Sequence, residues 1–90
     1  MTMTLLPAAR RSDDALDRLS PRELDVLSLM AEGRSNLAIA EELVLELKTV
    51  ETHVGRVFTK LGLGEDRREN RRVRAVVTYI GVHAERRGLS

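Results

Sequence analysis

The 90-residue chain contains no cysteine and no tryptophan, and it has only one tyrosine and one phenylalanine. Without cysteine there is no disulfide, no thiol redox or thiol catalysis and no thiolate zinc site. With so few aromatic rings, stacking of single-stranded bases on aromatic side chains is not expected. These absences argue against redox proteins and against readers of single-stranded nucleic acid.

Long apolar runs are missing as well. The apolar stretch at residues 5–9 is interrupted by Pro7 and followed by Arg10 and Arg11, so it is too short for a signal sequence or a membrane span. We therefore expect no membrane partner. The apolar fraction of 42% suits one compact domain of this length.

No charge of one sign dominates, because the chain has 15 basic and 14 acidic residues. The distribution is uneven, however: residues 21–47 carry a net −4, whereas residues 48–64 carry +2 and residues 65–90 carry +3. A polyanion would meet the second half of the chain. Alternatively, the arginines of residues 67–74 form a solvated helix face paired with nearby acids, and charge alone does not choose between these readings.

Capping residues and apolar spacing predict helices throughout. Ser20, Pro21 and Glu23 form a helix start, and Gly33 ends that helix. Ser35 caps a second, short helix that runs through about residue 43. Its buried face is predicted to comprise Leu37, Ile39, Ala40 and Leu43.

The third and fourth helices are predicted from apolar stripes of helical period. The third, at about residues 47–62, is marked by Val50, Val54, Val57, Phe58 and Leu61. The fourth is marked by Val73, Val76, Val77, Ile80 and Ala84. No segment alternates as a half-buried strand would, so the sequence predicts an all-α fold.

The ends of the chain are expected to lie outside this domain. We predict a flexible arm or linker at residues 1–18, a domain at residues 19–84 and a tail at residues 85–90. Leu16 and Leu19 are nevertheless expected to pack against the core. With so few residues before Ser20, we expect no receiver or ligand-sensing domain, so a signal would act elsewhere.

The second and third predicted helices, separated by about three residues, have the arrangement that places one helix in the major groove of DNA. If the apolar stripe of the third helix faces the core, the residues left on its outer surface are Lys48, Thr49, Glu51, Thr52, Gly55, Arg56, Thr59 and Lys60. This surface suits DNA, although the same residues would also serve as ordinary solvated surface.

The ordered motifs resemble those of LuxR-type helix-turn-helix domains, the effector domains of LuxR/FixJ-type response regulators. The matching segments, within about residues 19–80, are Leu19-Ser-Pro-Arg-Glu23, Gly33-Arg-Ser-Asn36, Ile39-Ala40, Leu43, Lys48-Thr-Val50, His53-Val54 and Lys60-Leu-Gly62. The resemblance implies a four-helix domain in the bacterial cytoplasm, at the nucleoid, that binds double-stranded DNA and regulates transcription. It also implies a homodimer on an inverted repeat, joined through the last helix at Val73, Val76, Val77 and Ile80.

The resemblance further assigns roles to individual side chains. The expected phosphate contacts are Ser35, Asn36, Lys48, Thr49, His53 and Lys60. The expected base-reading positions are Glu51, Thr52, Gly55 and Arg56. Arg56 suits guanine, Thr52 suits a thymine methyl group, and Glu51 suits the cytosine amino group. Four positions depart from the family pattern: Glu46, Leu47, Glu51 and Gly55. Glu46 is a poor helix cap, and Gly55 inside a helix costs about 1 kcal/mol relative to alanine. Leu47 replaces a residue that is commonly acidic or polar, and Glu51 and Gly55 replace residues that are often basic.

Catalysis is not expected. His53 as a metal ligand or catalytic base would need partners, yet the other histidine is His83, on a different predicted helix. The chain carries no nucleophile elbow and no glycine-rich phosphate loop, so we predict no enzyme activity, no metal and no cofactor.

Two alternatives to a LuxR-type regulator stay open at this point. One is a protein-interaction module that pairs with another regulator, or with a separate signalling protein, and does not bind DNA. The other is a promoter-recognition module similar to region 4 of sigma factors, which would also need RNA polymerase.

Overall fold

The computed structural model describes residues 15–64 and 67–86 of the chain, with side chains described up to residue 84. A helical turn at residues 15–17 is followed by four helices: α2 (Pro21–Ala31), α3 (Asn36–Leu43), α4 (Leu47–Lys60) and α5 (Arg68–Arg86). The described residues include no strand. The all-α prediction is therefore confirmed.

Helix α2 begins at the predicted capping box. The Ser20 hydroxyl accepts a hydrogen bond from the Glu23 backbone N–H (3.1 Å), and the Ser20 N–H donates to the Glu23 carboxylate (2.9 Å). Pro21 occupies the first helical position, where no N–H is needed. Beyond the helix, Gly33 adopts a left-handed conformation (φ +86°), as the predicted stop requires.

Helices α3 and α4 form the predicted helix-turn-helix. The Ser35 hydroxyl caps α3 by accepting from the Ala38 N–H at 3.1 Å. Helix α3 ends at Val44, whose φ of 56° is left-handed although valine is β-branched. Glu46 then precedes α4 without making a side-chain cap. The turn between the two helices thus contains one strained residue and one poor cap.

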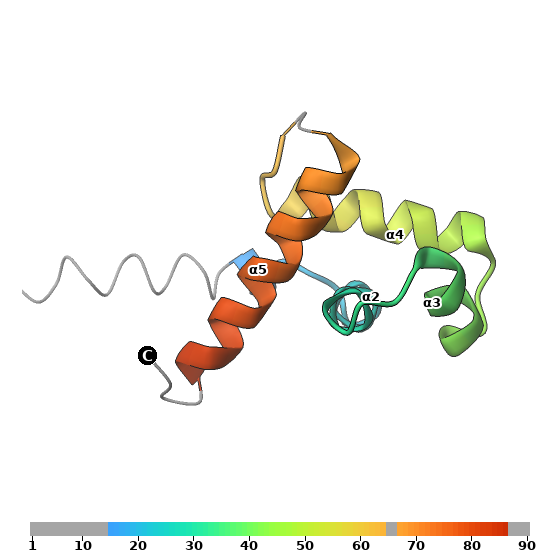
Figure 1. Ribbon diagram of the computed structural model, residues 1–90, viewed down its shortest axis with the longest axis horizontal. Coiled ribbons are helices and arrows are strands. Elements are labelled where there is room, and N and C mark those ends of the chain that lie inside the picture. The colour runs from blue at the N-terminus through green and yellow to red at the C-terminus, as the bar shows by residue number, and fades with distance from the viewer. Residues whose placement is uncertain (1–14, 65–66, 87–90) are drawn as a thin grey trace, which may run out of the picture.

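The core surrounds α2, which packs against both α4 and α5, while α3 packs against α4 (Figure 1). In Figure 1, α2 is seen nearly end-on beneath α4, and α5 runs obliquely past both. The buried apolar side chains on these elements are Val26, Leu27, Met30, Ile39, Ala40, Val50, Val54, Val57, Phe58, Ala75 and Val82.

Leu16 and Leu19 also belong to this core, as expected, with exposed fractions of 2% and 6%. The packed domain therefore reaches Leu16, which lies before the predicted start of the domain at residue 19. The remainder of the predicted arm, at residues 1–14, and residues 87–90 of the predicted tail lie outside the described residues.

One expectation about a buried face is wrong. Leu37 is 58% exposed, because the face of α3 that meets the core is formed by Ile39 and Ala40. In α5, the side that packs against the core is not the apolar stripe that marked this helix in the sequence. The core side carries Ala75 and Val82, which are buried. Much of the valine and isoleucine stripe that marked this helix instead faces outward.

None of the helices described is long and apolar enough to cross a membrane.

Candidate nucleic-acid interface

The four predicted base-reading positions lie together on the outward surface of α4. Glu51, Thr52, Gly55 and Arg56 are all exposed, whereas the opposite side of the helix is buried. This arrangement follows from helical periodicity, because residues four apart share a face. The Thr52 hydroxyl donates to the Lys48 carbonyl (3.1 Å), which leaves its methyl group as the part suited to an apolar contact.

Ser35, Lys48 and Thr49, like Asn36, are predicted phosphate contacts that lie near the starts of the two helices. Ser35 is exposed at the N-terminus of α3, and Lys48 is exposed in the first turn of α4, beside the half-buried Thr49. Backbone N–H groups at helix N-termini attract anions, and both starts belong to the same helix-turn-helix. These three side chains therefore suit contacts with a DNA backbone.

Asn36 is engaged within the protein. Its side-chain oxygen accepts a hydrogen bond from Nη1 of Arg72 at 2.8 Å, and Nη2 of Arg72 donates to the Arg34 carbonyl oxygen. Burial of the Arg72 guanidinium, together with the nearby charge of Arg68, lowers its pKa below the ordinary value for arginine. Arg72 thus ties α5 to the start of α3, and only the amide nitrogen of Asn36 is left for a ligand.

Lys60 is also engaged within the protein. Its Nζ lies 2.9 Å from Oε1 of Glu23, which is only 3% exposed. Burial by itself raises the pKa of the Glu23 carboxyl, but hydrogen bonds from Lys60 and Ser20 and the charge of Lys60 outweigh it, so the pKa is lowered overall. Lys60 therefore fastens the end of α4 to the start of α2, a role that its position in the sequence did not reveal.

The two histidines lie in different environments. His53 is half-buried on α4, and its Nδ1 is buried without a hydrogen-bond partner among the described groups. His83 lies on α5, where its ring packs against Tyr79 with 4.3 Å between ring centroids and the ring planes tilted by 54°. The described residues contain no cluster of three or more possible metal ligands.

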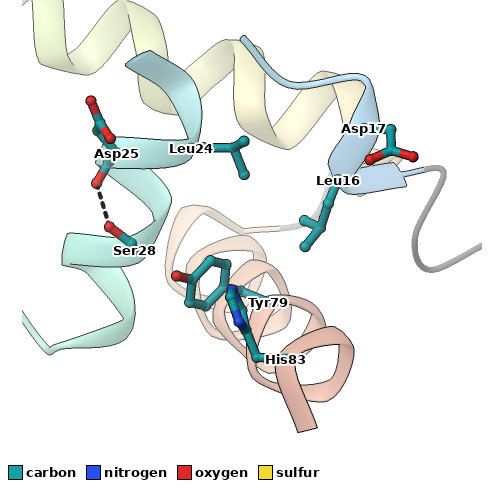
Figure 2. Close-up of a pocket in the computed structure, with 7 residues that line it drawn as sticks. All are labelled: Leu16, Asp17, Leu24, Asp25, Ser28, Tyr79 and His83. Carbon is teal, nitrogen blue, oxygen red and sulfur yellow. Dashed lines mark hydrogen bonds between the residues drawn. The ribbon is translucent and has the colours of Figure 1, made fainter. Parts of the chain in front are cut away.

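Tyr79 and His83 line a pocket of about 280 Å³ between α5, α2 and the turn at residues 15–17 (Figure 2). Leu16 and Leu24 point toward the two rings, while the Ser28 hydroxyl donates to the Asp25 carbonyl (2.9 Å). None of the predicted site residues lines this pocket. It is therefore separate from the outward surface of α4.

A second hollow lies on that outward surface and includes a residue that the sequence analysis did not single out. Its lining side chains are Thr52, Gly55, Arg56, Thr59 and Lys60 of α4 and Arg71 of α5. In the sequence, Arg71 was one of several arginines in a charged run. Only the packing of α5 beside the end of α4 distinguishes it.

The outward face of α4, following a capped α3, is the geometry expected of a helix-turn-helix. The family of bacterial regulatory proteins named the luxR family matches residues 17–69, which span α2, α3 and α4. The chain belongs to the LuxR family. The resemblance noted from the sequence motifs is thereby confirmed.

The LuxR-family relatives are regulators of greater length. The transcriptional regulatory protein LiaR of Bacillus subtilis is 43% identical over 49 residues, which cover 54% of this chain and 23% of LiaR. The oxygen regulatory protein NreC of Staphylococcus aureus is 48% identical over 52 residues, which cover 58% of this chain and 24% of NreC. The matched segment thus spans about a quarter of each relative. No solved structure matches this LuxR-family chain significantly.

Proposed function

We propose that this LuxR-family domain binds double-stranded DNA in a sequence-dependent manner and thereby regulates transcription in the bacterial cytoplasm. The observation that carries the proposal is the exposed row of Glu51, Thr52, Gly55 and Arg56 on α4, within a helix-turn-helix of this family. An α-helix fits the major groove of B-form DNA, where each base pair presents its own pattern of donors and acceptors. The relative LiaR is a transcriptional regulatory protein, which supports the same function.

Within this proposal, the side chains divide into two roles. Arg56 and its exposed neighbours on α4 read base edges, whereas Lys48, Thr49 and Ser35 contact phosphates and set the position of the helix. His53 and Asn36 contribute less directly, because Nδ1 of His53 is buried and the side-chain oxygen of Asn36 already accepts a hydrogen bond from Arg72. Lys60 acts mainly through Glu23, because its ammonium group already has a buried partner.

We further propose that two copies associate through α5 on an inverted repeat. Val73, Val77 and Ile80 are 61%, 62% and 53% exposed, and they follow one another at helical spacing. Such a stripe on the outside of a small domain is suited to an identical stripe on a second copy. Val76 differs from these three because it packs against the core. Half-sites would then lie about one helical turn of DNA apart.

The test of the function is selection of bound duplexes from a random library by the purified chain at moderate salt, followed by sequencing. An enriched inverted repeat would support both the DNA function and the dimer. Enriched single half-sites would support specific binding and contradict stable dimerisation. No enrichment would contradict sequence-specific binding and favour the protein-interaction module.

Two substitutions test the division of roles. Arg56→Ala should relax the preference at one base position of the recovered site, whereas Lys48→Ala should weaken binding to all duplexes to a similar extent. Both side chains are exposed, so neither substitution should disturb the core. Equal losses on every sequence for both variants would contradict the assignment of Arg56 to base reading.

The dimer has a test of its own. Val77→Glu places a charge in the centre of the exposed α5 stripe, and analytical ultracentrifugation should show a shift from dimer to monomer. Leu37→Glu adds the same charge at a similarly exposed apolar position on α3, outside the stripe, as a matched control. A monomeric wild-type chain, both free and bound to its selected DNA, would contradict the proposed dimer.

A further inference from the structure

The hollow on the outward surface of α4 is shared between two helices. Five of its lining residues come from α4, and Arg71, in the first turns of α5, closes one side. Gly55 contributes no side chain, and an added Cβ at this position would meet no atom within 4 Å apart from its chain neighbours and the backbone of its own helix. The hollow is thus open above the middle of α4 and bordered by basic groups.

The Arg71 guanidinium is positioned by its neighbours but makes few hydrogen bonds within the protein. Its Cζ lies 5.1 Å from the centre of the Phe58 ring, which fixes the group against the core by a cation–π contact. Nη1 donates to the Gly64 carbonyl across a long distance of 3.4 Å, and Nε is buried without a hydrogen-bond partner within the described part of the chain. A guanidinium has five N–H donors, so most of its capacity is left for a ligand.

The charges around the hollow favour an anion. Lys60 is paired with the buried Glu23, so it contributes little net charge. Arg56 and Arg71 form no ion pair with another described residue. Two cationic groups therefore border an open hollow on the face that we assign to DNA.

We propose that Arg71 binds a backbone phosphate of the DNA, so that the DNA-contacting surface extends from α4 onto the first turns of α5. This inference rests on the proposed function. Arginine matches phosphate oxygens with paired N–H donors, and a guanidinium already oriented by an aromatic ring loses little freedom on binding. A phosphate is favoured over a base because Arg71 lies on the helix beside α4, and phosphates flank a helix that occupies the groove.

The salt dependence of DNA binding tests this contact. Each neutralised phosphate adds about 0.9 to the magnitude of the log–log slope of affinity against salt concentration. Arg71→Gln should therefore reduce the magnitude of the slope by about 0.9 for each bound copy, which is about 1.8 for the proposed dimer, to the same extent on selected and on unrelated duplexes. Arg22→Gln removes the same charge from an exposed site on α2 and should leave the slope unchanged.

The outcomes separate this inference from the function on which it rests. A wild-type chain with no salt-dependent binding would overturn both. A salt-dependent wild type whose slope is unchanged in Arg71→Gln would overturn only the Arg71 contact. If Arg71→Gln lowers the thermal stability but leaves the slope unchanged, the role of Arg71 is to pack on Phe58.

A second measurement keeps the proposal testable if Arg71→Gln does not fold. Duplexes with one neutral methylphosphonate at successive positions can be bound by the wild type and by Arg71→Lys, which retains the charge. At one phosphate per half-site, neutralisation should weaken the wild type more than Arg71→Lys, because lysine lacks the paired donors. Identical sensitivity at every position would contradict the contact.

Discussion

One carboxylate oxygen of Glu23 accepts hydrogen bonds both from the Ser20 backbone N–H and from the Lys60 ammonium group, each at 2.9 Å. The first bond caps α2, and the second fastens the last turn of α4 to it. The orientation of the helix that we assign to DNA is therefore linked to the N-terminal cap of a different helix.

Glu23→Gln should lower the free energy of unfolding by about 1–2 kcal/mol at neutral pH, because the Lys60 ammonium group loses its charge-assisted bond to the buried carboxylate. Glutamine keeps an oxygen that can accept from Ser20, so the cap is largely retained. Urea denaturation of the wild type and the variant at pH 7 measures this difference. An unchanged midpoint would show that the pair adds nothing to stability.

The pH dependence of the same difference has a defined sign. The pKa of Glu23 in the folded chain is lowered below its ordinary value of 4.5, so its contribution is complete above that value and is lost as the pH falls through the folded pKa. The stability gap between wild type and Glu23→Gln should therefore shrink in acid. A gap that grows as the pH falls would contradict this account.

Val44→Gly should stabilise the domain by about 1 kcal/mol. Val44 is 88% exposed and has a φ of 56°, so its side chain gains little from burial while its backbone adopts a conformation that valine disfavours. Glycine removes this strain. Val44→Ala is the control, since alanine keeps a Cβ and should recover little of the gain. Thermal unfolding distinguishes the two variants, and equal midpoints would contradict the strain.

Glu46→Ser should also stabilise the domain, by about 1 kcal/mol, because serine supplies the side-chain cap that α4 lacks. Glu46→Ala keeps the position uncapped and removes the favourable charge near the helix start, so it should not gain stability. Chemical denaturation of the three chains checks the order. A Glu46→Ala variant as stable as Glu46→Ser would show that capping is not the cause.

Arg72 and Asn36 should be energetically coupled. Arg72→Met removes the bond to the Asn36 side chain (2.8 Å) and the bond to the Arg34 carbonyl, whereas Asn36→Ala removes only the first. In a double-mutant cycle, we expect a coupling of about 1 kcal/mol. Additive losses would mean that the bond between the two side chains contributes nothing.

The sequence predicted the fold well because the relevant signals are local. The capping box at Ser20, the cap at Ser35 and the stop at Gly33 each depend on neighbouring residues, and all three are found in the structure. The outward face of α4 was predictable for a similar reason. A single strong apolar stripe determines which side of this helix is buried, so the opposite side follows.

The relationships missed by the sequence analysis are those between distant residues. Nothing near Lys60 indicates that Glu23 is its partner, and nothing near Asn36 indicates Arg72. The rotation of α5 was ambiguous because this helix has apolar residues on two faces. Small Ala75 is buried in the core, while the larger Val77 is exposed, so residue size does not identify the core face of this helix.

Gly55 is a position on the outward surface of α4 at which substitutions should be well tolerated. Because a Cβ at this position would meet nothing within 4 Å beyond its chain neighbours and its own helix backbone, many side chains can be introduced there without disturbing the packed interior. A single substitution could add a donor, an acceptor or a methyl group and, at the same time, a better helix former. New binding preferences are therefore accessible at position 55 without the usual loss of stability, which makes it a natural starting point for retargeting the domain to a different operator.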